Sequence, residues 1–140
     1  MKSLTWGSVM LLMLLTGCKA PPVSTKLHPV CAGGEVMMQT TLWFGLNRPQ
    51  GGEISASDWQ HFVDADVTPR FKQGLSVYEA KGQWLEKAGG LTRENSKALM
   101  LIYEPDEESF ARIEALRDIY KKRFAQASVM RVDTPACISF

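Results

Sequence analysis

Side chains that can line a binding cleft gather in the middle of the sequence, around the ends of predicted strands. Arg70 follows the end of a predicted helix, and Gln83 and Trp84 follow a predicted tight turn. Glu94 precedes a predicted strand. Loops and strand ends are where clefts are commonly built, so Arg70 and Glu94 can orient a small ligand there. The interpretation that we favour is a structural ion pair between them, with Trp84 covering a sheet edge.

The remaining candidate for chemistry is His61, the one histidine in the predicted folded part. Histidine is the side chain best suited to proton transfer near neutral pH. His61 lies off the apolar helix stripe of Trp59 and Val63, so we expect a solvated residue, with a catalytic base as the less favoured alternative. The sequence contains no phosphate-binding loop, metal-ligand spacing or nucleophile elbow, and it therefore predicts neither a metal nor a cofactor.

The composition is that of one small, nearly neutral domain. The 140 residues include 16 Lys and Arg against 15 Asp and Glu, and 45% of them are apolar. This length allows one domain, and the apolar share is sufficient for a core. A net charge of +1 provides no basic surface for nucleic acid, which we exclude as a partner.

The N-terminus has the pattern of an export signal. Lys2 precedes an uncharged apolar stretch that is too short to span a bilayer comfortably. The tetrad LTGC at residues 15–18 resembles the lipobox of bacterial lipoproteins, which implies cleavage before Cys18 and a diacylglycerol thioether on it. Lys19, where aspartate would signal inner-membrane retention, implies the outer membrane by the same resemblance. We expect a signal peptide over 1–17, a lipidated, periplasm-facing tether over 18–30 and a single domain over 31–140.

Two cysteines, Cys31 and Cys137, remain once Cys18 carries lipid. In an oxidising periplasm such a pair favours one disulfide. Two unrelated thiols or a metal pair are the alternatives. Structural zinc requires four ligands, which disfavours the metal pair.

Hydrophobic periodicity and capping residues predict an α+β domain. The expected elements are strands over 35–45, 74–80, 97–104 and 128–132, helices from Ser55 to Pro69 and over 106–124, a turn at Lys81 and Gly82 with a short return over 83–85, and an extended tail over 136–140. Their β-α-β-β-α-β order is that of the ferredoxin-like fold, an antiparallel sheet with two helices on one face.

The disulfide predicts how the first and last strands pair. In a ferredoxin-like sheet these two strands lie antiparallel beside each other. A bridge between Cys31 and Cys137 in a continuous ladder then places Glu35 opposite Asp133.

Four short motifs carry a family resemblance that spans Thr40 to Phe140. They are WFGL at 43–46, PRF at 69–71, GQW at 82–84 and YKKRF at 120–124. With them, the chain resembles a family of bacterial envelope proteins that is catalogued only as a domain of unknown function. The resemblance implies a secreted or lipidated protein and brings no activity, cofactor or catalytic residue.

Two functions are open at this point. We favour a non-catalytic, lipid-anchored periplasmic module that binds a partner protein or a small ligand. The alternative is a small-molecule enzyme of the dimeric α/β-barrel type, with a cleft near Arg70, Trp84 and Glu94 and with His61 moving protons. The sheet face away from the helices, which includes Trp43, is expected to serve as a homodimer interface or a ligand pocket.

The lipid anchor makes a direct prediction. Mass spectrometry of the mature protein should find an acylated Cys18 at its N-terminus. The Cys18→Ala protein should leave the membrane fraction, because acyl chains provide about 0.8 kcal/mol of membrane affinity per buried methylene. A wild-type protein recovered without lipid in the soluble fraction would contradict the anchor.

Overall fold

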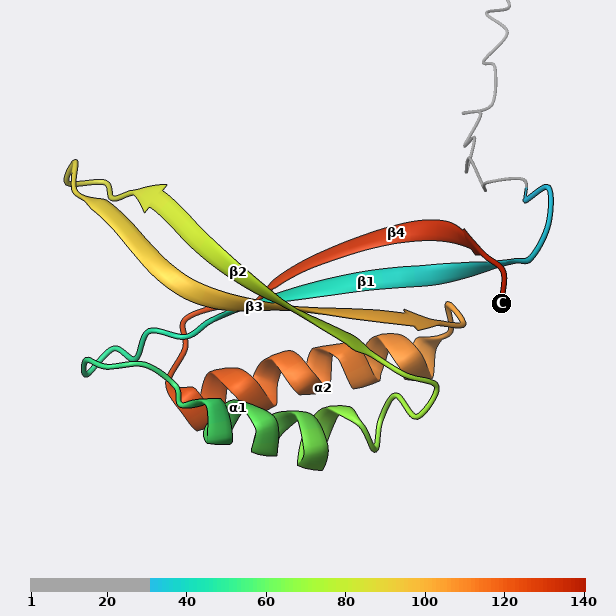
Figure 1. Ribbon diagram of the computed structural model, residues 1–140, viewed down its shortest axis with the longest axis horizontal. Coiled ribbons are helices and arrows are strands. Elements are labelled where there is room, and N and C mark those ends of the chain that lie inside the picture. Colours follow the sequence, from blue (N-terminus) through green and yellow to red (C-terminus); the bar gives the residue numbers. More distant parts are fainter. Residues whose placement is uncertain (1–30) are drawn as a thin grey trace, which may run out of the picture.

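The computed structural model describes residues 31–140, which form one sheet with helices against one of its faces (Figure 1). The elements are β1 (Glu35–Gly45), α1 (Ala56–Phe62), the π-helical η1 (Val63–Val67), β2 (Ser76–Leu85), β3 (Leu91–Tyr103), α2 (Glu107–Phe124) and β4 (Met130–Ile138). The predicted signal peptide, the tether and Cys18 lie outside the described residues. Within residues 31–140, none of the helices is long and apolar enough to cross a membrane.

The four strands form an antiparallel sheet in the order β2-β3-β1-β4. The helices cover one face of this sheet, and none of the helices within residues 31–140 lies over the opposite face (Figure 1). Together with the β-α-β-β-α-β order of the elements, this arrangement is the ferredoxin-like fold. The α+β fold predicted from the sequence is confirmed.

Both α-helices begin at side-chain caps, as the sequence predicts. The Ser55 hydroxyl accepts a hydrogen bond from Asp58 N at 3.1 Å, which satisfies an amide without a partner inside α1. The Asp106 carboxylate does the same for Ser109 N at 2.6 Å. At its other end α2 stops at Ala125, whose left-handed backbone (φ 55°) turns the chain toward β4.

The core is centred on Phe44, a fully buried residue of β1. The rings of Trp59, Phe62 and Tyr120 pack edge-to-face with it, at centroid distances of 5.3, 5.5 and 4.5 Å. The Tyr120 hydroxyl then donates a hydrogen bond to Gly45 O at 2.9 Å. This cluster therefore holds both α1 and α2 against the end of β1.

The hairpin of β2 and β3 is longer than the sequence predicts. The predicted turn at Lys81 and Gly82 is wrong, because both residues lie inside β2 and are paired with β3. The chain turns instead at residues 86–90, where Gly89 has a φ of 90° that glycine adopts without strain. Residues 83–85 therefore continue β2 and do not return as a separate strand.

The register of β1 and β4 also differs from the prediction, and β4 is one strand without the predicted break. Glu35 lies opposite Ile138, not opposite Asp133. The reason is that Cys31 does not continue β1, since the chain bends at Gly34, which has a φ of 79°. A Cβ atom at Gly34 would lie 2.0 Å from Ile138 O, so this close approach requires glycine.

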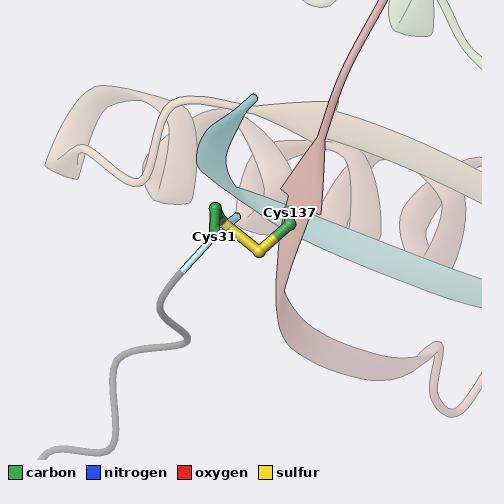
Figure 2. The surroundings of a disulfide bond; sticks show 2 residues. All are labelled: Cys31 and Cys137. Atoms are coloured by element: carbon green, nitrogen blue, oxygen red, sulfur yellow. A yellow bond between two sulfur atoms is a disulfide. The ribbon is translucent and has the colours of Figure 1, made fainter. Parts of the chain in front are cut away.

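Cys31 and Cys137 form the predicted disulfide (Figure 2). Their Cα atoms are 5.5 Å apart, and 106 positions separate them in the sequence. Cys137 belongs to β4, an edge strand of the sheet. The bridge therefore joins the segment before β1 to the edge strand and closes a loop around nearly the whole domain.

A polar network connects β4 to β1, β3 and α2. The buried Tyr103 and Thr40 hydroxyls are 2.6 Å apart, and Thr40 donates a hydrogen bond to Asp133 at 2.6 Å. Arg131 donates to Asp133 at 2.9 Å and to Glu114 of α2 at 2.8 Å. Because every member has a partner, this network stabilises the edge strand.

The disulfide should contribute strongly to stability. The chain-entropy model gives about 4–5 kcal/mol for a loop of this length. We expect reductant to lower the midpoint of chemical denaturation of the wild type and to leave the Cys31→Ser/Cys137→Ser protein unaffected. Thiol titration of the denatured, unreduced protein should detect neither cysteine. A reactive thiol at either position would rule out the bridge.

Acid should weaken the network at Asp133. Burial raises the pKa of Asp133, but hydrogen bonds from Arg131 and Thr40 outweigh it and hold this pKa below its usual value. A carboxyl with a lowered folded-state pKa stabilises the fold above about pH 4 and loses that contribution as the pH falls through the folded value. We expect Asp133→Asn to lower the melting temperature near neutral pH and to have a smaller effect at about pH 3, because the unfolded-state carboxyl is then mostly protonated. Calorimetry of Asp64→Asn, at an exposed position of η1, is the control, and an equal effect of Asp133→Asn at both pH values would contradict the linkage.

Candidate ligand-binding site

A hollow of about 830 Å³ opens at the hairpin end of the sheet. Its walls are the β2–β3 hairpin, the end of β1 with the loop that follows it, and the connection from α2 to β4. Its lining is mixed, with the side chains of Trp43, Trp84, Glu94, Ser96, Gln126 and Met130 among its members. This volume lies within the range of pockets that bind small organic molecules.

Glu94 lines the hollow and lies between two glycines on the neighbouring strands. Gly82 of β2 is directly opposite Glu94, and Gly45 of β1 is directly opposite Ser96. A Cβ atom on Gly45 would lie 2.6 Å from Glu94 Oε2, and one on Gly82 would lie 3.4 Å from Glu94 Cγ. The carboxylate therefore occupies space that a side chain at position 45 would fill.

The charge of Glu94 has no counter-charge within ion-pair distance. Among residues 31–140 eight ion pairs occur, and none of them includes Glu94. Its side chain also takes part in no hydrogen bond with another described side chain. The charge of Glu94 also acts on Tyr120. Burial raises the pKa of the Tyr120 hydroxyl, and the negative charge of Glu94 raises this pKa further. The site thus holds a half-buried carboxylate that is free to pair.

Two partly exposed indoles flank this carboxylate. Trp84 lies two residues beyond Gly82 on β2, and Trp43 lies two residues before Gly45 on β1, so each is about 7 Å along its strand from a glycine. Trp84 is 42% exposed and Trp43 is 37% exposed. The Trp84 indole N–H donates to Glu86 Oε1 at 2.7 Å, which fixes the orientation of the ring. Exposed aromatic surface is therefore available near Glu94 on both neighbouring strands.

The structure separates the residues that the sequence placed in one cleft. Gln83, Trp84 and Glu94 line the hollow, whereas Arg70 is not among its lining residues. Arg70 donates to the Asp66 carbonyl at 2.7 Å, just beyond η1. The chain from there enters the opposite end of β2, roughly 20 Å from Glu94 along the ladder at about 3.3 Å per residue. The predicted pairing of Arg70 with Glu94 is therefore wrong.

His61 also lies outside the hollow, exposed on α1. The described residues contain no group of His, Cys, Asp and Glu that could hold a metal ion.

Sequence reasoning missed the two glycines that make room for the carboxylate. The sequence pattern ends a strand at Gly45 and predicts a turn at Gly82. A glycine inside a strand often marks a close approach by another group, and this is the signal that could have identified both positions. Only the register shows that the approaching group is Glu94.

The hollow continues onto the uncovered face of the sheet. One row across the four strands consists of Tyr78, Ala98, Trp43 and Met130. Three of these side chains are well exposed: Tyr78 at 51%, Trp43 at 37% and Met130 at 55%. An apolar row of this kind, beginning at the rim of a hollow, is typical of a binding surface.

Solved structures similar to the described domain include two of a phage SAM lyase and one of CutA. A phage SAM lyase in complex with S-methyl-5'-thioadenosine has a TM-score of 0.56 and 24% sequence identity, over 76% of this chain and 85% of that chain. A phage SAM lyase in its apo state also has a TM-score of 0.56, with 21% identity over 76% and 86% of the two chains. CutA from Synechococcus elongatus has a TM-score of 0.48 and 10% identity, over 73% and 78%. The likeness to the two phage SAM lyase structures concerns the fold alone.

No curated protein matches the sequence. A family model does match it, over residues 39–140, which is nearly all of the described domain. The chain therefore belongs to the family described as Protein of unknown function (DUF3574).

Proposed function

We propose that this protein is a lipid-anchored envelope protein whose domain binds a small organic molecule in the hollow at Glu94. The observation that carries the proposal is an ion-pair-free carboxylate, among the described residues, inside a hollow of about 830 Å³. Carboxylates at structural sites are normally paired or fully solvated. One that stays half-buried between two glycines is better explained by a ligand.

The lining supports a ligand that has both polar and apolar parts. Trp43, Trp84 and Met130 supply apolar surface, and Ser96 and Gln126 supply hydrogen-bonding groups. Pockets with this combination bind small molecules and fix their orientation through a few polar contacts.

The anchorage is part of the same proposal and depends on the N-terminal pattern. The disulfide between Cys31 and Cys137 is consistent with an oxidising compartment such as the periplasm, where disulfides form and persist. The lipid on Cys18 would then hold the hollow close to a membrane surface, and the outer membrane is the one that Lys19 favours.

An enzyme is the second candidate, favoured by one observation: the phage SAM lyases of like fold act on a small molecule. SAM carries an adenine ring and a sulfonium cation, which match the kinds of groups that an indole and a carboxylate recognise. Because Arg70 and His61 lie outside the hollow, catalysis there would depend on Glu94. The uncovered sheet face would be the place where a second copy of the chain packs.

A thermal-shift experiment tests the binding site. The full chain in detergent is heated alone and with SAM, S-methyl-5'-thioadenosine or adenosine, and a ligand that binds the folded state should raise the melting temperature. The rise should disappear in Trp84→Ala and persist in His61→Ala, which alters an exposed residue outside the hollow. Chromatography of incubated SAM separates the two functions, since turnover would indicate an enzyme. A wild type that none of these compounds stabilises, or a rise unaffected by Trp84→Ala, would count against this site.

A further inference from the structure

We infer that the ligand of the hollow presents a cationic group to Glu94, held between that carboxylate and the indoles of Trp43 and Trp84. This inference rests on the proposed function and specifies the chemical class of its ligand. It does not depend on which molecule carries the cation.

The first argument concerns which charges share the sheet face with Glu94. Residues directly opposite in an antiparallel ladder point to the same side, so the register assigns each strand residue to a face. On the face that carries Glu94, the strands place neither lysine nor arginine, and Glu35 is the other charged residue. The strands of the described domain therefore supply no counter-charge to Glu94 from this face.

The second argument concerns the two cations that do border the hollow. Arg48, in the loop after β1, is already paired with Asp58 at 2.8 Å. Lys81 lines the hollow from β2 but belongs to the other face of the ladder, and it is exposed to solvent. Neither lies within ion-pair distance of Glu94.

The third argument is the cost of covering a carboxylate. A neutral ligand that filled the hollow would strip water from Glu94 without replacing its interactions, and a charge left in that state is strongly unfavourable. A cation restores the lost interaction by pairing with the carboxylate. An organic cation gains further from the indoles, because a positive charge is attracted to the face of an aromatic ring.

The glycines determine where this carboxylate lies. A Cβ atom on Gly45 would be 2.6 Å from Glu94 Oε2 and 2.9 Å from Glu94 Cδ, so alanine there must displace the carboxylate. A Cβ atom on Gly82 would be 3.4 Å from Glu94 Cγ and 3.7 Å from Trp84, which is ordinary contact. Neither glycine has a positive φ, so alanine causes no backbone strain at either position. Gly45→Ala and Gly82→Ala are therefore a matched pair in which only the first moves the charge.

An NMR titration of the full chain in detergent tests the charge requirement. The probes are choline and 3,3-dimethyl-1-butanol, which have the same shape and differ in the positive charge. The Trp84 indole N–H resonance, identified by its loss in Trp84→Phe, is the reporter. We expect choline to shift it at concentrations about tenfold lower than the neutral alcohol, in line with a cation–aromatic contact and an ion pair.

Three variants test whether Glu94 is the group that distinguishes choline from the neutral alcohol. Glu94→Gln should reduce the preference for choline to near unity, Gly45→Ala should do the same, and Gly82→Ala should behave as the wild type. The melting temperatures of all three show whether each is folded. Equal shifts by both probes, no shift by choline, or an unchanged preference in folded Glu94→Gln would overturn the inference.

These outcomes are distinct from failure of the proposed function. Equal shifts of the Trp84 resonance by both probes in the wild type would leave the hollow as a ligand site and remove only the cationic class. Absence of any response to these probes and to the nucleoside compounds together would remove the site itself.

Discussion

The end of β1 is where the core and the candidate site depend on the same few residues. Phe44 points toward the helices and packs with Trp59, Phe62 and Tyr120, while its neighbours in the strand point to the other face. The Tyr120 hydroxyl also holds the carbonyl of Gly45. Because a one-residue slip would turn Phe44 out of the core, this packing sets the register of β1 and, with it, the position of Gly45 beneath Glu94.

Glu94 lacks the ion pair that other partly buried carboxylates of the described domain have. The carboxylates of Asp133 and Glu114 are paired with arginine, and Asp58 is both a helix-cap partner and an ion-pair partner. Glu94 is instead placed between two glycines, in a hollow rimmed by indoles. A domain of this size has little stability to spare, and an unpaired half-buried charge is more consistent with a binding role than with a structural one.

The disulfide constrains the domain at the end of the sheet opposite the hollow. It joins Cys31, where the proposed tether enters the domain, to the edge strand β4. Under the proposed anchorage, a pull on the tether is shared by β1 and β4 and does not act on the first strand alone. The polar network around Asp133 supports the same edge strand from its helical side.

The sequence by itself determined the order of the elements, the two capped helices, the cysteine pair and the face of β1 that enters the core. These features are set by local signals: strand and helix periodicity, capping residues and cysteine count. The tertiary structure decided the length of the hairpin, the register of β4 and the neighbours of Glu94. Gly82 is a turn signal in isolation, but its backbone bonds to β3 keep it in a strand. The bend at Gly34 takes Cys31 out of the ladder, whereas Cys137 stays paired in β4. Arg70 precedes the start of β2, whereas the β2–β3 ladder places Glu94 near the far end of that strand. Pairing between strands, and not distance along the chain, decides which side chains meet.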